Sequence, residues 1–286
     1  MANGLSIHIG INKVDPRHYS GWDGALLACE FDANDMADLA KRRGFDTRTI
    51  LTKDATAATV TAALTDAAGT LDTGDILFLS YSGHGGQVPD ARGAKGDETD
   101  DKLDETWVLY DRQLLDDELY ALWQQFKPGV RILVLSDSCH SGTATKVIEA
   151  VRPEALAGAI DLDLEPSAPP PEHVFRGMPK DLVMPVYRQN HEVYDAVQRA
   201  GGDEVDVQAG VLLLSGCQDS QTSADGRRNG LFTATLLKVW DDGKFKGGYR
   251  RFWRRIVDQM PPWQSPNFFP VGQVKMDFRR QKPFSI

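Results

Sequence analysis

Two short stretches of this chain carry residues that could do covalent chemistry. VLSDSCHSGTA is an apolar run that ends at Cys139 among small and polar residues, and LFLSYSGHGGQ ends a second apolar run at His84 between glycines. A cysteine attacks a carbonyl as its thiolate, so it needs a nearby base or positive field to lower its pKa from about 8.5. A histidine can take that proton and return it to a leaving amine. The two stretches together predict a cysteine nucleophile with a histidine base.

The glycines beside His84 fit the same chemistry. Without a Cβ they let a substrate backbone approach, and their amide N–H groups are left to stabilise a developing oxyanion. Each stretch alone has an equally good alternative, with Cys139 as a buried structural thiol and His84 as a hydrogen-bonded histidine in a glycine turn. The presence of both at matched strand ends favours catalysis.

An alternation of apolar runs and helical patterns surrounds the two stretches. It predicts an α/β fold of three layers, with a mostly parallel central sheet and helices on both faces. In such sheets the reactive crevice lies beyond the carboxyl ends of the strands, so neighbouring strands would bring His84 and Cys139 together. The predicted strands are 5–11, 45–51, 75–82, 130–136 and 209–216, and the predicted helices lie near 28–43, 56–68, 116–126 and 230–240.

Two later regions differ from this pattern. Residues 150 to about 188 hold most of the clustered prolines without clear periodicity, which predicts a loop or linker. An aromatic cluster near the C-terminus predicts core and the wall of a substrate groove. Its members are Trp240, Phe252, Trp253, Trp263, Phe268 and Phe269.

Composition excludes several classes of protein. A net charge of -9 argues against binding to nucleic acid, which depends on neutralising phosphates. The cysteines Cys29, Cys139 and Cys217 lack CxxC spacing, which argues against a disulfide framework or a zinc site. Cys217 in particular reads as a buried thiol at a strand end. With neither a signal-peptide pattern nor an apolar run of about 18 residues, we expect a soluble, cytoplasmic protein without a membrane partner.

The two motifs resemble those of a known family. YSGHGGQ, with its histidine 55 residues before the cysteine of DSCHSG, is similar to the caspase superfamily, peptidase family C14. The DSCHSG form resembles the type I metacaspases and the bacterial orthocaspases, and the animal-caspase signature QACRG is absent. GALLACEFDANDMADLAKRRGF resembles the family's first helix segment, and LLLSGCQDSQTSADGRRNGLFTATLL its small-subunit region.

The resemblance implies a caspase-like sandwich that forms one structural domain. Residues 1–149 would be the large-subunit region with the histidine and cysteine, 150–205 a linker or insertion, and 206–286 the small-subunit region. It also implies a cysteine endopeptidase with His84 and Cys139 as the catalytic dyad. The amides of Gly85 and Cys139 would form the oxyanion hole, and His140 would have no role in proton transfer.

The resemblance further implies an acidic pocket that accepts Arg or Lys just before the scissile bond. The matching residues are Asp32 and Asp137, with Cys29 and Ser82 beside them, and paired carboxylates complement a guanidinium. Asp32 has an alternative interpretation as a helix-start carboxylate. Asp137, between an apolar strand and the nucleophile, requires a partner.

Many metacaspases are activated by calcium, and their ligands match Asp104, Asp116 and Asp117. The family's fourth ligand is replaced by Lys146, so either water, a carbonyl or Glu149 substitutes, or the protein works without calcium. The carboxylates of residues 90–107 also have a simpler interpretation as a solvated face.

Family members often cut themselves between the large and small regions after a basic residue. The candidate cleavage positions in and beside the linker are Arg152, Arg176, Lys180, Arg188 and Arg199. An equally good interpretation is that these residues are solubilising charges in a loop. Two rival functions stay open, a catalytically silent regulatory or scaffold protein and a caspase-like protease with non-basic specificity. By analogy with the family we expect a monomer whose substrates are proteins or peptides.

Overall fold

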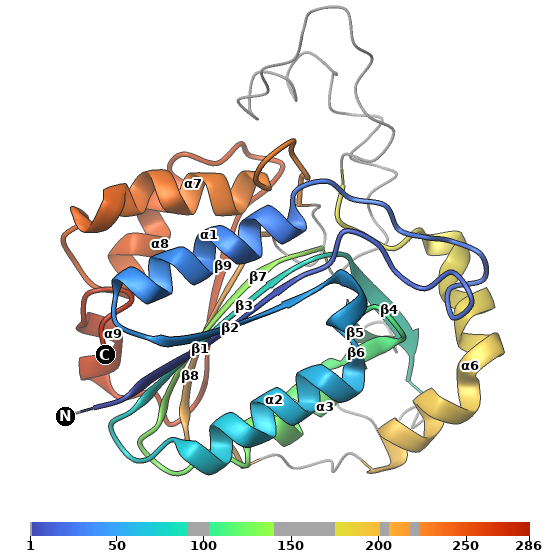
Figure 1. Ribbon diagram of the computed structural model, residues 1–286, viewed down its shortest axis with the longest axis horizontal. Helices are drawn as coiled ribbons and strands as arrows, with labels where there is room; N and C mark the ends of the chain where they lie inside the picture. Colours follow the sequence, from blue (N-terminus) through green and yellow to red (C-terminus); the bar gives the residue numbers. More distant parts are fainter. Residues whose placement is uncertain (1, 91–102, 140–174, 201–205, 218–222) are drawn as a thin grey trace, which may run out of the picture.

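The computed structural model describes residues 2–90, 103–139, 175–200, 206–217 and 223–286. Its main sheet has six strands in the order β2-β1-β3-β7-β8-β9 (Figure 1). All neighbouring pairs are parallel except β8 and β9. The strands are β1 (Gly4–Gly10), β2 (Asp46–Leu51), β3 (Ile76–Ser82), β7 (Arg131–Asp137), β8 (Gly210–Ser215) and β9 (Asn267–Gly272).

Helices cover both faces of this sheet, as Figure 1 shows. One face carries α1 (Cys29–Arg42), α7 (Leu231–Trp240), α8 (Tyr249–Val257) and α9 (Met276–Arg280), and the other carries α2 (Ala57–Thr70) and α3 (Asp116–Trp123). Two short 3₁₀ helices are η1 (Thr52–Asp54) and η3 (Asp241–Gly243).

Two hydrophobic cores follow from the alternation of side chains along each strand. In the fully buried β3, Ile76 and Phe78 join the core under α1 and α7, whereas Leu77 and Leu79 join the core under α2 and α3. The predicted three-layer α/β architecture is therefore confirmed. The predicted strands and helices agree closely with those observed, although α3 ends at Trp123 rather than near 126.

A second, three-stranded antiparallel sheet was not predicted. It contains β4 (Gly85–Pro89), β5 (Leu103–Val108) and β6 (Gln113–Leu115) in that order. The strands are short and β5 begins among carboxylates, so their apolar positions give a weak period-2 signal. They form strands because each one pairs with another segment of this sheet through backbone hydrogen bonds.

The helix α6 (Lys180–Ala200) corrects part of the predicted loop at 150–188. Pro185 lies inside it and Asn190 leaves helical geometry (φ -126°), which hid the periodicity. Only a few of its side chains are buried, and among them Tyr194 and Gln198 face the body of the protein. Figure 1 shows α6 beyond the sheet, next to β4.

No helix within the described ranges combines the length and apolar character needed to cross a lipid bilayer.

Candidate active site

The two predicted catalytic residues follow adjacent strands. β3 and β7 pair in parallel with Ser82 opposite Asp137, and His84 and Cys139 each lie two residues further on. Both therefore lie at the same edge of the sheet. The two backbones approach so closely that a Cβ on Gly85 would lie 1.5 Å from the carbonyl oxygen of Cys139, so only glycine is tolerated at position 85.

The loop between β1 and α1 orients the imidazole of His84. This ring is buried, its Nε2 lies 3.0 Å from the carbonyl oxygen of Gly24, and the Trp22 ring packs on it at 4.7 Å between centroids. Because a carbonyl only accepts hydrogen bonds, Nε2 must carry the proton in the neutral ring. Nδ1 is then the basic nitrogen of His84.

The sulfur of Cys139 is also buried and held in place. The backbone N–H of Ser223 donates to Sγ, and Sγ lies 3.5 Å from the carbonyl oxygen of Ser223. Ser223 is far away in the sequence and belongs to the segment that leads to α7. The position of the predicted nucleophile therefore depends on contacts between the two halves of the chain.

A segment of the chain itself lies across these strand ends. The carbonyl oxygen of Arg176 accepts hydrogen bonds from the backbone N–H groups of Gly85 and Cys139, both at 3.0 Å. The N–H of Arg176 donates to Ser223 (2.9 Å), and the flanking residues form β-bridges, Phe175 with Ala224 and Gly177 with Gly85. An extended peptide added to strand edges in this way is a common mode of peptide binding.

The side chain of Arg176 fills a closed acidic pocket. Its guanidinium is fully buried and lies 2.7 Å from Asp32, 3.0 Å from Asp137 and 2.9 Å from Asp225. Ser82 accepts a further hydrogen bond at 2.9 Å. A buried charge is tolerated only when it is paired and hydrogen-bonded, and this guanidinium meets that condition.

The electrostatics of the pocket favour a cation. Burial alone lowers the pKa of Arg176, but Asp137, Asp32 and Asp225 outweigh burial and raise it well above its usual range. Burial raises the pKa of Asp32 to about 6, although the ion pair with Arg176 opposes this rise. Three carboxylates around one guanidinium leave the pocket acidic overall, which complements arginine or lysine and opposes an acidic side chain.

The start of α7 completes the pocket. The Gly230 N–H donates to Asp32 (3.1 Å), and both the N–H and the hydroxyl of Thr233 donate to Asp137. A Cβ on Gly230 would lie 2.6 Å from the guanidinium of Arg176. Glycine at this position therefore leaves the space that a long basic side chain needs.

The structure brings together most of the predicted pocket residues. Asp32, Asp137 and Ser82 contact Arg176, and the buried Cys29 lies close enough to contribute to its raised pKa. Asp32 also lies in the first turn of α1, so its alternative interpretation holds as well.

Two residues of the site were not predicted from the sequence. Asp225 was not singled out as a pocket residue, and Ser223 was not linked to Cys139. Arg176 was named, but only as one of five basic candidates for self-cleavage. The DSQTSAD stretch gave no chemical signal for Asp225 or Ser223. Of the other four candidates, Lys180, Arg188 and Arg199 lie on α6, and Arg152 falls outside the described residues, as does His140.

The remaining predictions for this region have mixed outcomes. Cys217 is buried at the end of β8 as expected, with Sγ 3.3 Å from the carbonyl oxygen of Ser138. Trp263 packs against Phe175, but Phe269 is 50% exposed and is not part of the core, because it lies on the edge strand β9.

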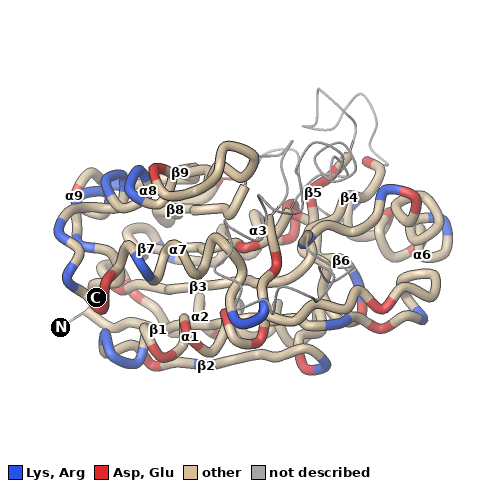
Figure 2. The backbone as a smooth tube through the Cα atoms, turned by 90° about the horizontal axis from the view of Figure 1, so that it is seen from above, with Lys and Arg blue, Asp and Glu red and all other residues tan. Residues whose placement is uncertain are grey.

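The predicted calcium ligands lie near the start of α3, where Figure 2 shows a concentration of acidic residues. Asp104 is buried on β5, where Gln198 donates to it at 2.6 Å, so it does not belong to a solvated face. Burial, together with Asp104, Asp117 and Glu105, raises the pKa of Asp116 to about 8.

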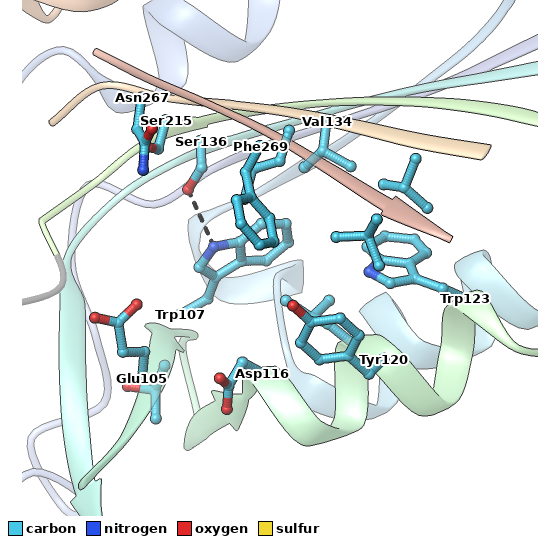
Figure 3. Close-up of a pocket in the computed structure, with 15 residues that line it drawn as sticks. Glu105, Trp107, Asp116, Tyr120, Trp123, Val134, Ser136, Ser215, Asn267 and Phe269 are labelled. Atoms are coloured by element: carbon cyan, nitrogen blue, oxygen red, sulfur yellow. Dashed lines mark hydrogen bonds between the residues drawn. The ribbon is translucent and has the colours of Figure 1, made fainter. Parts of the chain in front are cut away.

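These carboxylates do not form a prepared ion site. Among the residues that the structure describes, no group of three or more His, Cys, Asp or Glu side chains is arranged to hold a metal ion. Lys146 and Glu149 lie outside the described residues. Figure 3 shows Asp116 and Glu105 instead at one end of a cavity of about 290 Å³, which aromatic side chains line beneath the sheet.

Comparison with known proteins decides the family. The model of the caspase domain, Peptidase_C14, matches residues 8–273. The chain belongs to the caspase domain family. Metacaspase-1 of Mycosarcoma maydis is 34% identical over 261 residues, which cover 81% of this chain and 61% of that protein. Metacaspase-4 of Arabidopsis thaliana is 33% identical over 48% of this chain and 33% of its own length. This caspase domain thus spans less than two thirds of the length of these relatives.

Solved structures agree with this assignment. Protein GSU0716 from Geobacter sulfurreducens superimposes with a TM-score of 0.84 at 45% identity, over 99% of this chain and 98% of that chain. Caspase-1 from Spodoptera frugiperda gives a TM-score of 0.51 at 9% identity, over 96% of this chain and 87% of that chain. The second likeness concerns the fold alone, and it confirms the predicted caspase-like sandwich.

Proposed function

We propose that this caspase domain is a cysteine endopeptidase that cleaves after Arg or Lys, and that its own Arg176–Gly177 bond is its first substrate. One observation carries the proposal. The carbonyl oxygen of Arg176 lies between the amides of Gly85 and Cys139 while its guanidinium occupies the acidic pocket. This is the arrangement that an oxyanion hole and a specificity pocket require of a bound substrate.

The proposed reaction uses these residues in the following roles. Nδ1 of His84 takes the proton of the Cys139 thiol, and the sulfur attacks the carbonyl carbon of Arg176. The carbonyl electron pair moves to the oxygen, whose negative charge the N–H groups of Gly85 and Cys139 stabilise. When the intermediate collapses, the C–N bond to Gly177 breaks and His84 returns the proton to the released amine.

The resulting thioester is resolved by water. His84 removes a proton from the water, whose oxygen attacks the thioester carbon, and the sulfur leaves as the thiolate and regains a proton. The products are a new carboxylate on Arg176 and a new N-terminus on Gly177. Cys139 is regenerated for another cycle.

Self-cleavage can be tested by intact mass spectrometry of the purified chain over time. We expect two fragments that meet at the Arg176–Gly177 bond, and an uncut chain in both Cys139→Ala and Arg176→Gln. Arg188→Gln is the matched control, because Arg188 is exposed on α6 and should be cut like the wild type. Unchanged cleavage of Arg176→Gln, or cutting after Arg188 alone, would contradict the proposed bond.

Action on other substrates needs a second experiment. Fluorogenic peptides with Arg, Lys or Asp before the reporter group should be cleaved in the first two cases and only by a chain that retains Cys139. Cleavage of the Asp peptide alone would favour a protease of non-basic specificity. A chain that cleaves neither itself nor any peptide would be a silent regulatory or scaffold protein.

Calcium activation is a separate proposal. Its support is the burial of Asp104 and Asp117 beside Asp116, where a cation would offset the mutual repulsion of the carboxylates. We expect calcium to raise the rate of self-cleavage over that in a chelator and Asp116→Asn to lose this response. Equal rates with calcium and chelator would remove calcium as an activator, and calorimetry would then detect an ion bound only for structure.

A further inference from the structure

The residue that precedes Arg176 has a contact surface of its own. The ring of Phe175 meets Trp263 edge to face, with 6.4 Å between centroids and 88° between planes. Both rings belong to a small apolar cluster with Ala224, Leu231 and Met260, and Met260 also packs against the main core under α1 and α7. Edge-to-face geometry is favourable for aromatic pairs because the positive ring edge meets the negative ring face.

The position of Trp263 is fixed relative to the bound peptide. The side chain of the next residue, Gln264, is fully buried, and its Oε1 accepts a hydrogen bond from the N–H of Ala224 (3.0 Å). Its Nε2 donates to the carbonyl of Gly216 (3.0 Å) and to the hydroxyl of Ser223 (2.9 Å). Ser223 and Ala224 are the residues that bind the backbone of the segment at Arg176 and Phe175. Trp263 is therefore part of a built wall beside the peptide.

We infer that this wall is a second specificity subsite, which selects an aromatic side chain immediately before the basic residue. Substrates of the class aromatic–Arg or aromatic–Lys would use both sites, and Trp263 is the residue that determines the choice. The inference rests on the proposed function, because it presumes that other peptides bind as residues 175–178 do. It adds a preference for the residue before the Arg or Lys, a position that the acidic pocket does not contact.

The preference is measured with two fluorogenic peptides that differ only in the residue before Arg, Phe in one and Ala in the other. We expect kcat/KM to be about tenfold higher for the Phe peptide, the ratio that one favourable aromatic contact supplies. In Trp263→Ala the ratio should fall to near one through loss of rate on the Phe peptide alone. Trp263→Phe should keep most of the preference.

Two controls distinguish an effect on the subsite from a general effect on folding. Phe269→Ala removes an aromatic side chain that lines the different cavity of Figure 3, and it should leave the ratio unchanged. Thermal unfolding midpoints of all variants show whether each one is folded. Equal rates for the two peptides in the wild type, or a ratio that survives in a folded Trp263→Ala, would overturn the inference.

A binding experiment distinguishes failure of the subsite from failure of the proposed function. In the triple variant Cys139→Ala, Phe175→Gly, Arg176→Gly the chain can neither react nor fill its own acidic pocket and the Trp263 wall. Calorimetry with the peptides Phe-Arg-Gly-Met and Ala-Arg-Gly-Met should show about tenfold tighter binding of the first. If this preference is found while the wild type cleaves no Arg peptide, the subsite stands and the proposed protease function falls. If the two peptides bind equally while Arg peptides are cleaved, the proposed protease function stands and the subsite falls.

Discussion

At the scale of single residues, Asp225 shows how one carboxylate joins two parts of the site. One of its oxygens accepts from Nε and Nη2 of Arg176, at 3.2 and 2.9 Å, and the other accepts from the N–H of Leu27 at 2.8 Å. Leu27 belongs to the loop that also supplies the Gly24 carbonyl to His84. Asp225 thus links the acidic pocket to the loop that orients His84.

Replacing Asp225 with asparagine keeps its shape and removes its charge. A hydrogen bond between charged groups contributes about 1.5–3 kcal/mol, so Asp225→Asn should lower kcat/KM for Arg peptides roughly 10- to 100-fold. Asp35→Asn is the matched control, because Asp35 contacts Asn229 and Arg228 beside the pocket rather than Arg176. An Asp225→Asn chain with wild-type kcat/KM would show that Asp32 and Asp137 suffice for recognition.

A second residue, His8, makes the stability of the fold depend on pH. It is buried on β1 with Nδ1 2.8 Å from the hydroxyl of Ser80, and burial, aided by Lys41, lowers its pKa to about 3. Between this value and about 6.5 the unfolded chain binds a proton that the folded chain does not. The free energy of unfolding must therefore fall as pH decreases through this range.

From pH 7 to pH 5, His8 alone should lower the free energy of unfolding by about 2 kcal/mol. Urea unfolding of the wild type and of His8→Asn at both values checks this, because asparagine does not titrate. The pH-dependent loss should be smaller in the variant by that amount. An equal loss in both chains would mean that His8 is protonated in the folded state too.

At the scale of elements, α6 holds the loop between β1 and α1 against the site. The Asn190 side chain donates to the carbonyl of His18 at 3.0 Å, and the hydroxyl of Tyr194 lies 2.7 Å from the His18 ring. The same loop carries Trp22 and Gly24, which orient His84. The same side-chain amide donates to the carbonyl of Val186 at 2.8 Å, so the residue at the kink links α6 to this loop.

Loosening this contact should affect catalysis more than stability. Asn190→Ala removes the hydrogen bond to the His18 carbonyl, worth about 1 kcal/mol, together with one to the carbonyl of Val186 within α6. We expect self-cleavage to slow about fivefold while the unfolding midpoint changes by a few degrees. Arg188→Ala, on the exposed side of α6, is the control. A normal rate in Asn190→Ala would mean that the loop keeps its position without α6.

At the scale of the whole molecule, the proposed cut separates two halves of one sheet. The Arg176–Gly177 bond lies between β7 and β8 in the sequence, yet these strands are hydrogen-bonded neighbours, and both cores contain residues from either side of the bond. α6 also follows the bond and packs on β4, which precedes it. Cutting the bond removes no strand pairing.

We therefore expect the two fragments to stay together after self-cleavage. Size-exclusion chromatography of the cut protein should give one peak with the elution volume of uncut Cys139→Ala, and the fragments should separate only in denaturant. Two peaks in native buffer would contradict this expectation. They would mean that the uncut linker is needed to hold β8 against β7.

The sequence by itself determined the layered α/β architecture and the pair His84 and Cys139. Both could be predicted from short stretches of sequence. The apolar periodicity of a strand or a helix is visible within a few residues, and each of the two motifs lies directly after an apolar run. Asp32, Asp137 and Ser82 were also within reach, through the resemblance to the family. Calcium, by contrast, stays a prediction.

Only the tertiary structure decided which basic residue enters the pocket and what surrounds it. Arg176 meets Asp32 across 144 positions of sequence and Asp225 across 49, and no local pattern encodes contacts of that separation. The same holds for β4 to β6 and for α6, which are weak as isolated elements and form because partners elsewhere in the chain bury one of their faces. Local periodicity therefore specified the scaffold, and long-range packing specified the substrate-like segment within it.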